Sequence, residues 1–302
     1  PDMSVYSPSP GLVTNSSSVL FNVSASDSVG VSEIRVYVDG VLKLSNSSDR
    51  LCDSLDFSEG SHSVLVVAYD LAGNRRDSSF TVTVDLTPPD MSVYSPSPGL
   101  VTNSSSVLFN VSASDSVGVS EIRVYVDGVL KLSNSSDRLC DSLDFSEGSH
   151  SVLVVAYDLA GNRRDSSFTV TVDLTAPIVS IEYPINGTVL NSSTVLVKWG
   201  IVDVSEITFV GVYVNGSPVL ESNELVFSCL LNLSDGDYIV MVVAVDVAGN
   251  KGYCIVTFSV KLMVGGQSVF GLSRFISLEI TALLGYIVGA VYTFRALYKR
   301  RR

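Results

Sequence analysis

Four aspartates in this sequence have the spacing to gather around one ion. Asp85 and Asp90 flank the proline-rich segment 86–89, whereas Asp115 and Asp158 stand where two runs of apolar residues end. Ca²⁺ takes about six to eight oxygen ligands, and carboxylates that converge with little basic compensation supply them. If the fold brings the four together, they predict a calcium site; the alternative is a set of acidic turns in contact with water.

Asp158 also belongs to a recurring motif. DLAGN occurs at 70–74 and 158–162, and DVAGN occurs at 246–250. In the first copy, Gly73 and Asn74 are expected to adopt the positive φ of a tight hairpin, and Asp70 to accept hydrogen bonds from its backbone N–H groups. The motif therefore predicts a turn, and through its aspartate a contribution to the candidate calcium site.

Nucleophilic or acid–base catalysis is not expected. The two histidines, His62 and His150, occupy one repeated position that Tyr238 fills in the third copy. A general base would not be replaced by a phenol, so they are expected at the rim of the fold. The sequence has no CxxC pair, glycine-rich phosphate loop or GxSxG motif, and we assign no catalytic residue and no cofactor other than calcium.

The cysteines leave two hypotheses open. Cys229 and Cys254 share the inward phase of the third copy, at strand starts expected at the same end of the fold, so either a disulfide joins them or both are free thiols. Cys52 and Cys140 are single in their copies. They are expected to be small core thiols, with intermolecular crosslinking as the alternative.

Surface glycosylation is predicted by ten of the 14 asparagines, which stand in Asn-x-Ser/Thr sequons. The alternative is that Asn-Ser pairs are good turn formers. That explanation fails for Asn22, which is expected in the middle of a strand on its solvent side. The ten are Asn15, Asn22, Asn46, Asn103, Asn110, Asn134, Asn186, Asn191, Asn215 and Asn232.

These residues are positioned by an internal repeat. A shift of 88 residues maps 1–87 onto 89–175 without a mismatch, and a second shift gives a diverged copy. Each copy is long enough to close its own hydrophobic core, so we expect three domains in tandem. The domains are repeat 1 (1–88), repeat 2 (89–176) and repeat 3 (177–262).

Within each repeat, apolar residues alternate with polar ones. In SVLFNVSASD, Val19, Phe21 and Val23 fall on one face while Asn22 and Ser24 fall on the other. This period predicts half-buried strands, and seven of them fit one repeat as an immunoglobulin-like sandwich, which gives an all-β fold class. In repeat 1 the expected strands are 4–6, 19–26, 34–38, 42–44, 51–57, 62–69 and 79–85.

The sandwich topology is what should unite the four aspartates. Its last strand ends opposite its own DLAGN turn, so the linker leads to two loops of the next repeat, which contain Asp115 and Asp158. Pro88 and Pro89 should stiffen this linker. The second linker, DLTAPI, has lost one acid, and any calcium site there is expected to be weaker.

A transmembrane helix is predicted at 275–294, which contains one ionisable residue, Glu279. Such a helix spans about 30 Å, the thickness of the hydrocarbon core. The linker 263–274 precedes it and the basic tail 295–302 follows, which places the tail inside the cell and the repeats outside. The alternatives are a buried core helix and a sorting signal that is removed. The chain begins with proline, and we expect a longer natural product.

The charge distribution argues against a nucleic-acid partner. Residues 1–262 contain 13 basic and 30 acidic side chains, and 263–302 contain 6 basic and one acidic. An acidic body without a basic stripe lacks the electrostatic footprint that nucleic-acid binding requires. The partners expected instead are the membrane, other surface proteins and glycans.

Repeats 1–3 resemble the immunoglobulin-like repeat common in bacterial and archaeal surface proteins. VYVDG at 36–40 and the DxAGN turn carry the resemblance. It implies stalk, spacer or adhesion modules without catalytic residues, and with the dense sequons it suggests an archaeal envelope. We therefore expect a membrane-anchored, glycosylated surface stalk or adhesion protein. The alternative is the membrane-proximal stalk of a surface enzyme or carbohydrate-binding protein whose active domain precedes this chain.

Overall fold

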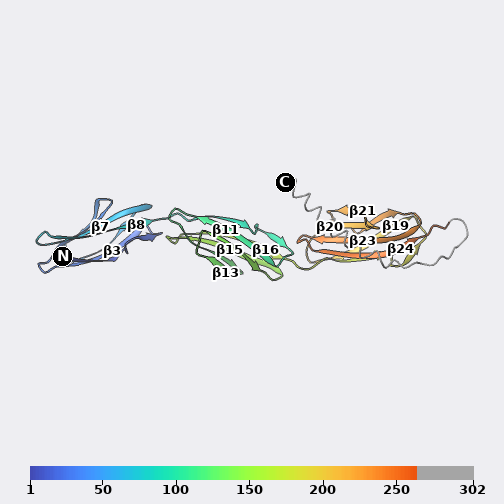
Figure 1. Ribbon diagram of the computed structural model, residues 1–302, viewed down its shortest axis with the longest axis horizontal. Helices are drawn as coiled ribbons and strands as arrows, with labels where there is room; N and C mark the ends of the chain where they lie inside the picture. Colours follow the sequence, from blue (N-terminus) through green and yellow to red (C-terminus); the bar gives the residue numbers. More distant parts are fainter. Residues whose placement is uncertain (264–302) are drawn as a thin grey trace. The chain divides into compact units, whose positions relative to one another are not determined.

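The computed structural model describes residues 1–263, which fold into β-strands and connecting turns. Three β-sandwiches follow one another along the chain, built from strands β1–β8, β9–β16 and β17–β24 (Figure 1). The all-β, tandem immunoglobulin-like prediction is confirmed for these residues. Among them, no helix has the length and apolar character needed to cross a membrane. The predicted helix at 275–294 lies outside the described residues.

Each sandwich packs a three-stranded sheet on a five-stranded sheet. In repeat 1 the strand orders are β1-β3-β6 and β2-β8-β7-β4-β5. Its strands are β1 (Asp2–Ser7), β2 (Leu12–Thr14), β3 (Ser18–Ser26), β4 (Val31–Val38), β5 (Val41–Asn46), β6 (Arg50–Asp56), β7 (Gly60–Asp70) and β8 (Arg75–Val84).

The other two repeats have the same strand orders. Repeat 2 comprises β9 (Asp90–Ser95), β10 (Leu100–Thr102), β11 (Ser106–Ser114), β12 (Val119–Val126), β13 (Val129–Asn134), β14 (Arg138–Asp144), β15 (Gly148–Asp158) and β16 (Arg163–Val172). Repeat 3 comprises β17 (Ile178–Tyr183), β18 (Thr188–Leu190), β19 (Thr194–Val202), β20 (Ile207–Val214), β21 (Ser217–Ser222), β22 (Ser228–Asn232), β23 (Gly236–Asp246) and β24 (Lys251–Val260).

The alternating residues form the core between the two sheets. Phe21 and Val23 of β3 and Val36 of β4 are 0% exposed, and each such side chain contributes about 1.5–3 kcal/mol by leaving water. In repeat 3, Trp199 takes the place of Val23 and is 1% exposed. It is the single tryptophan of the chain, so its fluorescence reports on repeat 3 alone.

The structure has one strand more per repeat than the sequence predicted. β2 is three residues long and pairs in parallel with β8. Three residues show too little alternation to identify a strand, whereas the strands expected at 4–6 and 42–44 are parts of the six-residue β1 and β5. The predicted strand 42–44 corresponds to β5, which pairs with β4 at the edge of the five-stranded sheet.

The VYVDG motif is the hairpin between β4 and β5. Asp39 has φ 49° and Gly40 has φ 78°. Two successive positive φ angles in a two-residue loop are the type I′ turn that matches the twist of paired strands. Asn215 and Gly216 repeat it in repeat 3, with φ 50° and 83°.

Candidate functional site

The DLAGN motif forms the turn between the last two strands of each repeat. In repeat 2, Asp158 Oδ1 accepts hydrogen bonds from the backbone N–H groups of Gly161 (2.6 Å) and Asn162 (2.9 Å). Gly161 has φ 95°, as a tight turn requires. The prediction of a positive φ at the asparagine was wrong: Asn74 does not adopt one, because it leads directly into β8 while its side chain bonds Asp70.

The asparagine of this turn also holds the preceding linker. Asn162 Nδ2 donates to Asp158 Oδ2 and to the backbone carbonyl of Asp85, both at 2.8 Å. Arg164, two residues further on, donates from Nε to the carbonyl of Pro89 at 3.3 Å. We call the segment DLTPPD (85–90) linker 1, and its meeting with the loops of repeat 2 the first joint.

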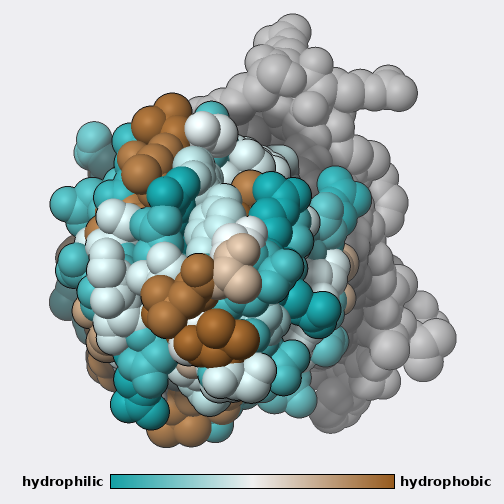
Figure 2. Space-filling model, turned by 90° about the vertical axis from the view of Figure 1, so that its left-hand side faces the viewer, coloured by the Kyte–Doolittle hydropathy of each residue, from teal (hydrophilic) through white to brown (hydrophobic). Residues whose placement is uncertain are grey.

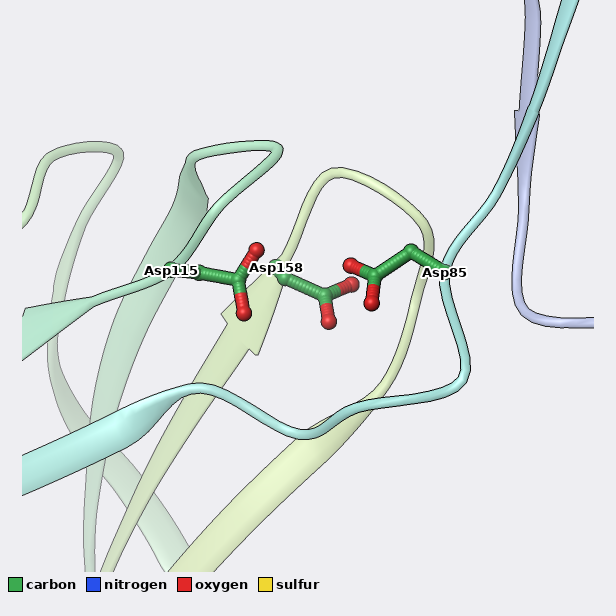
Figure 3. A group of neighbouring side chains, drawn as sticks. All are labelled: Asp85, Asp115 and Asp158. Atoms are coloured by element: carbon green, nitrogen blue, oxygen red, sulfur yellow. The ribbon is translucent and has the colours of Figure 1, made fainter. Parts of the chain in front are cut away.

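Three of the four predicted aspartates come together in the first joint. Each of Asp85, Asp115 and Asp158 offers a carboxylate oxygen within 4.8 Å of the others. Asp85 follows β8, Asp115 follows β11 and Asp158 ends β15, and Figure 3 shows their carboxylates facing one another. Asp90 is not part of the cluster, since its side chain is 91% exposed and lies 3.7 Å from Arg164 Nη2.

The Asp85 carboxylate is buried in an acidic environment. The residue is 1% exposed; its Oδ1 accepts a hydrogen bond from the Thr87 N–H at 3.1 Å, while its Oδ2 is buried without a hydrogen-bond partner. Burial raises the pKa of Asp85, and the negative charges of Asp115, Asp158 and Glu59 raise it further against the opposing Thr87 bond. A carboxylate in this position stays ionised only if a positive group compensates for it.

A second acidic cluster lies at the second joint, where linker 2 (DLTAPI, 173–178) meets the loops of repeat 3; a weaker site was expected at this linker from the sequence, with no residues named for it. Asp173, Asp203 and Asp246 offer oxygens within 4.8 Å of one another, and Asn250 Nδ2 donates to the Asp173 carbonyl at 2.8 Å. The signal was present, because each residue lies 88 positions after its counterpart in the first joint.

The linker aspartate of the second joint has hydroxyl partners. The Ser205 hydroxyl donates to Asp173 Oδ2, and the Thr175 hydroxyl donates to Oδ1 at 2.8 Å. The Ser205 bond, followed by the Thr175 bonds, lowers the pKa of Asp173 against the effect of burial. The two linker aspartates therefore shift in opposite directions.

Repeat 1 has aspartates at the same loop positions. Asp27 and Asp70 correspond there to Asp115 and Asp158. The amino group of Pro1 lies 3.2 Å from Asp27 Oδ2. The Asn74 side chain donates its hydrogen bond to Asp70 Oδ2, within its own turn. Asn74 therefore supplies a reference for the side-chain bond within the turn.

His62 lies in a Ser–His–Asp array that sequence spacing did not reveal. Its Nδ1 is 2.7 Å from Asp39 Oδ2, which raises the His62 pKa, and its Nε2 is 3.3 Å from Ser58 Oγ. However, Nε2 also lies 3.0 Å from the Ser58 carbonyl, an acceptor that requires a proton on this nitrogen. A nitrogen that donates there cannot take the serine proton, so the array is a structural clamp.

The same clamp in repeat 3 uses a phenol. Tyr238 replaces the histidine, and its hydroxyl donates to the Ser234 carbonyl at 2.9 Å. Donation to this carbonyl is thus common to His62 and Tyr238 at the repeated position.

The cysteines are free thiols. Cys229 on β22 and Cys254 on β24 belong to opposite sheets and are both half-buried, and the disulfide considered from the sequence is not formed. Cys52 and Cys140 are exposed, so the prediction of core thiols was wrong. The physical reason is the strand period: Leu51 points into the core, and the next residue must face the solvent.

All ten sequon asparagines are exposed. Asn22 and Asn110 lie on the solvent side of β3 and β11, as predicted. Asn46 and Asn134 use their amide groups locally, since each donates to a backbone carbonyl four residues later at 2.8 Å.

Comparisons with known proteins found similar solved structures and one matching family model. The solved structures that are similar include fibronectin(III)-like modules of Clostridium thermocellum CbhA, with 22% sequence identity, 57% of this chain and 94% of that chain covered, and a TM-score of 0.44. Three consecutive Ig domains of titin have 13% identity, 84% and 94% coverage, and a TM-score of 0.49. A bacterial ice-binding adhesin has 19% identity, 82% and 92% coverage, and a TM-score of 0.33. No curated protein matches the sequence.

The family comparison is more specific. Residues 1–66 and 89–154 match the family model described as Bacterial Ig domain. Both segments begin where a repeat begins and end within the strand that leads to the DLAGN turn. The first two repeats of this chain are therefore bacterial immunoglobulin-like domains arranged in tandem.

Proposed function

We propose that the chain is the stalk of a cell-surface protein, with its repeats outside the cell and the segment 275–294 as a single-pass anchor. The observation that supports this most directly is the contact that recurs at both joints. Asn162 and Asn250 each donate to the backbone carbonyl of the preceding linker aspartate at 2.8 Å. A bond that recurs at the same position orders the entry of each linker, which is what a spacer between tandem domains requires.

The repeats of this stalk carry N-linked glycans in the same proposal. The exposure of all ten sequon asparagines supports it, because an acceptor asparagine must be reached by the modifying enzyme. On the face of the molecule seen in Figure 2, hydrophobic side chains occur in small groups separated by hydrophilic ones, which suits modules surrounded by water. The partners proposed for such a surface are other surface proteins or glycans.

The test is to locate the protein in cells that produce it. Protease added to intact cells should cleave the repeats, and alkaline carbonate should leave the residual C-terminal fragment in the membrane fraction. Enzymatic or chemical deglycosylation should reduce the mass of the extracted protein. Repeats that are protected in intact cells but cleaved after lysis would contradict the proposed location. An unchanged mass after deglycosylation would contradict the glycan part alone.

A further inference from the structure

The first joint contains a buried polar atom that the protein leaves without a partner. Asp85 is 1% exposed, and its Oδ2 has no hydrogen bond, whereas its Oδ1 accepts from the Thr87 N–H. Burying an ionised carboxylate oxygen without a partner is costly. The Asp85 carboxylate lies beside those of Asp115 and Asp158, which brings further negative charge to the same place (Figure 3).

The neighbouring carboxylates are held in position by the loops that bear them. Asp115 Oδ1 accepts a hydrogen bond from the Val117 N–H at 2.8 Å. Asp158 is fixed by the N–H groups of Gly161 and Asn162 and by the Asn162 side chain. These bonds orient the carboxylates before any ligand arrives, which lowers the entropic cost of binding one.

Basic side chains of the described residues do not compensate the cluster. The charged groups that shift the pKa of Asp85 are all acidic. Arg164, the basic residue that contacts the linker, lies 3.7 Å from Asp90 and donates to the Pro89 carbonyl instead. The cluster thus combines excess negative charge, hard oxygen ligands and one buried oxygen in need of a positive partner.

We infer that the first joint binds one Ca²⁺ ion through Asp85, Asp115 and Asp158. Ca²⁺–oxygen distances of about 2.3–2.6 Å place two ligands of one ion up to about 5 Å apart, and the three oxygens lie within 4.8 Å of one another. Mg²⁺ demands a near-ideal octahedron and usually keeps several of its waters, so three protein carboxylates suit Ca²⁺ better. Because the ligands come from linker 1 and from two loops of repeat 2, the ion would tie the linker to the domain. This inference does not depend on the cellular location proposed above.

The second joint should bind Ca²⁺ more weakly. Its carboxylates have the same spacing, and Asp203 Oδ2 is buried without a partner. The linker aspartate, however, already accepts hydroxyl hydrogen bonds from Ser205 and Thr175. An ion would have to displace the Ser205 bond to reach Asp173 Oδ2, whereas Asp85 Oδ2 is available without such a loss.

The test is calorimetric titration of CaCl₂ into the metal-stripped full chain at neutral pH and constant ionic strength. We expect a tighter site of one Ca²⁺ per chain, with Mg²⁺ binding at least about ten-fold more weakly. Asp85→Asn and Asp115→Asn should each weaken this site by about ten-fold or more, since each removes one charged ligand. Asp90→Asn removes an equal charge from the same linker but lies outside the cluster, and should change the affinity less than about two-fold.

Several outcomes would overturn the inference. Absence of saturable Ca²⁺ binding by the wild-type chain would mean that the carboxylates share a proton instead. An equal loss in Asp90→Asn and Asp85→Asn would indicate general attraction of cations to an acidic surface. Circular dichroism verifies the fold of each variant, and Asp115→Asn, on a partly exposed loop, provides the test if Asp85→Asn fails to fold. Two sites of equal affinity would contradict the distinction between the joints.

Discussion

The two joints hold equivalent linker aspartates in opposite electrostatic environments. Burial and neighbouring acids raise the pKa of Asp85, whereas hydrogen bonds from Ser205 and Thr175 lower that of Asp173. Two bonds distinguish the joints: Ser205 occupies the position of Val117 in repeat 2, and the Thr175 hydroxyl donates to Asp173 whereas the equivalent Thr87 hydroxyl donates to Glu59. The same fold therefore leaves Oδ2 of the linker aspartate without a hydrogen bond beside Val117, and hydrogen-bonded beside Ser205.

The linkers also rest on their repeats in different ways. In the first joint the Pro89 carbonyl accepts a hydrogen bond from the Arg164 side chain. In the second joint the equivalent residue is Gly252, and a Cβ built there would lie 1.7 Å from the Pro177 carbonyl oxygen. The first joint uses a long polar side chain, and the second uses direct approach of one backbone to another. Packing can thus replace a hydrogen bond at the same position of a repeat.

The largest effect is expected from Gly252→Ala. The new methyl group would overlap the Pro177 carbonyl, so linker 2 would have to leave its place on β24, at a cost of about 3 kcal/mol. Urea unfolding followed by the fluorescence of Trp199 measures this loss in repeat 3 alone. Gly236→Ala is the matched control, because its Cβ would lie 3.6 Å from the nearest atom, in the Tyr238 ring. Equal midpoints for the two variants would show that the close approach is not maintained in solution.

The next largest effect should have opposite signs at the two joints. In metal-free buffer at neutral pH, Asp173→Asn should destabilise the protein by about 2 kcal/mol, because it weakens charge-assisted bonds from Ser205 and Thr175. Asp85→Asn should stabilise it by about 1 kcal/mol, because it removes an uncompensated buried charge. Calorimetric unfolding of both variants measures the changes. Destabilisation by both substitutions would contradict the opposite signs expected at the two joints.

The pH dependence of the same two residues follows from the direction of each shift. A raised folded-state pKa favours the protonated form, so Asp85 contributes stability at acid pH that is lost as pH rises from its ordinary value, about 3.9, through the raised pKa. A lowered folded-state pKa acts in reverse. The stability from Asp173 is present above its ordinary value and is lost as pH falls through the lowered pKa. Subtracting each asparagine variant's curve from that of the wild type should isolate these opposite slopes.

A smaller loss is expected for the joint asparagine. Asn162→Ala removes the side-chain bond to Asp158 within the turn and the bond to the Asp85 carbonyl. Asn74→Ala in repeat 1 removes only the equivalent bond within the turn. The additional cost at position 162 should be about 1 kcal/mol. Hydrogen exchange of linker peptides follows the joint directly, since DLTPPD and DLTAPI differ in mass. Identical stabilities and unchanged exchange of DLTPPD would mean that the bond does not order the linker.

The sequence was sufficient for the sandwich and for the clustering of three of the four predicted aspartates, because both follow from repetition and alternation. The period of two placed Phe21 and Val23 in the core, and the opposite ends of the last strand and its turn predicted the meeting of Asp85 with Asp115 and Asp158. It was wrong for Asp90, whose position depends on a contact with Arg164 that lies 74 residues away. The expectation of a weaker second site rested on the loss of that same acid.

The structure gives a different reason for a weaker second site, and the reason could not be found by spacing. A serine in place of a valine in a loop is an ordinary difference between diverged copies, and only three-dimensional proximity shows that Ser205 reaches the linker aspartate. The period of the repeat determines which aspartates cluster at each joint. The hydrogen bonds that each carboxylate oxygen accepts depend on the loop residues around it, which the period does not constrain.

The smallest expected change in stability, and the most direct test of this explanation, comes from exchanging the two loop residues. Val117→Ser should supply a hydroxyl to Asp85 and weaken Ca²⁺ binding at the first joint, and Ser205→Val should free Asp173 and strengthen binding at the second. Both positions are only half-buried, so folding stability should change by less than about 1 kcal/mol. Calcium titration of the double variant should then show the order of affinities reversed. If the first joint remained the tighter site, the difference would have to come from other residues that distinguish the joints, such as Arg164 and Gly252.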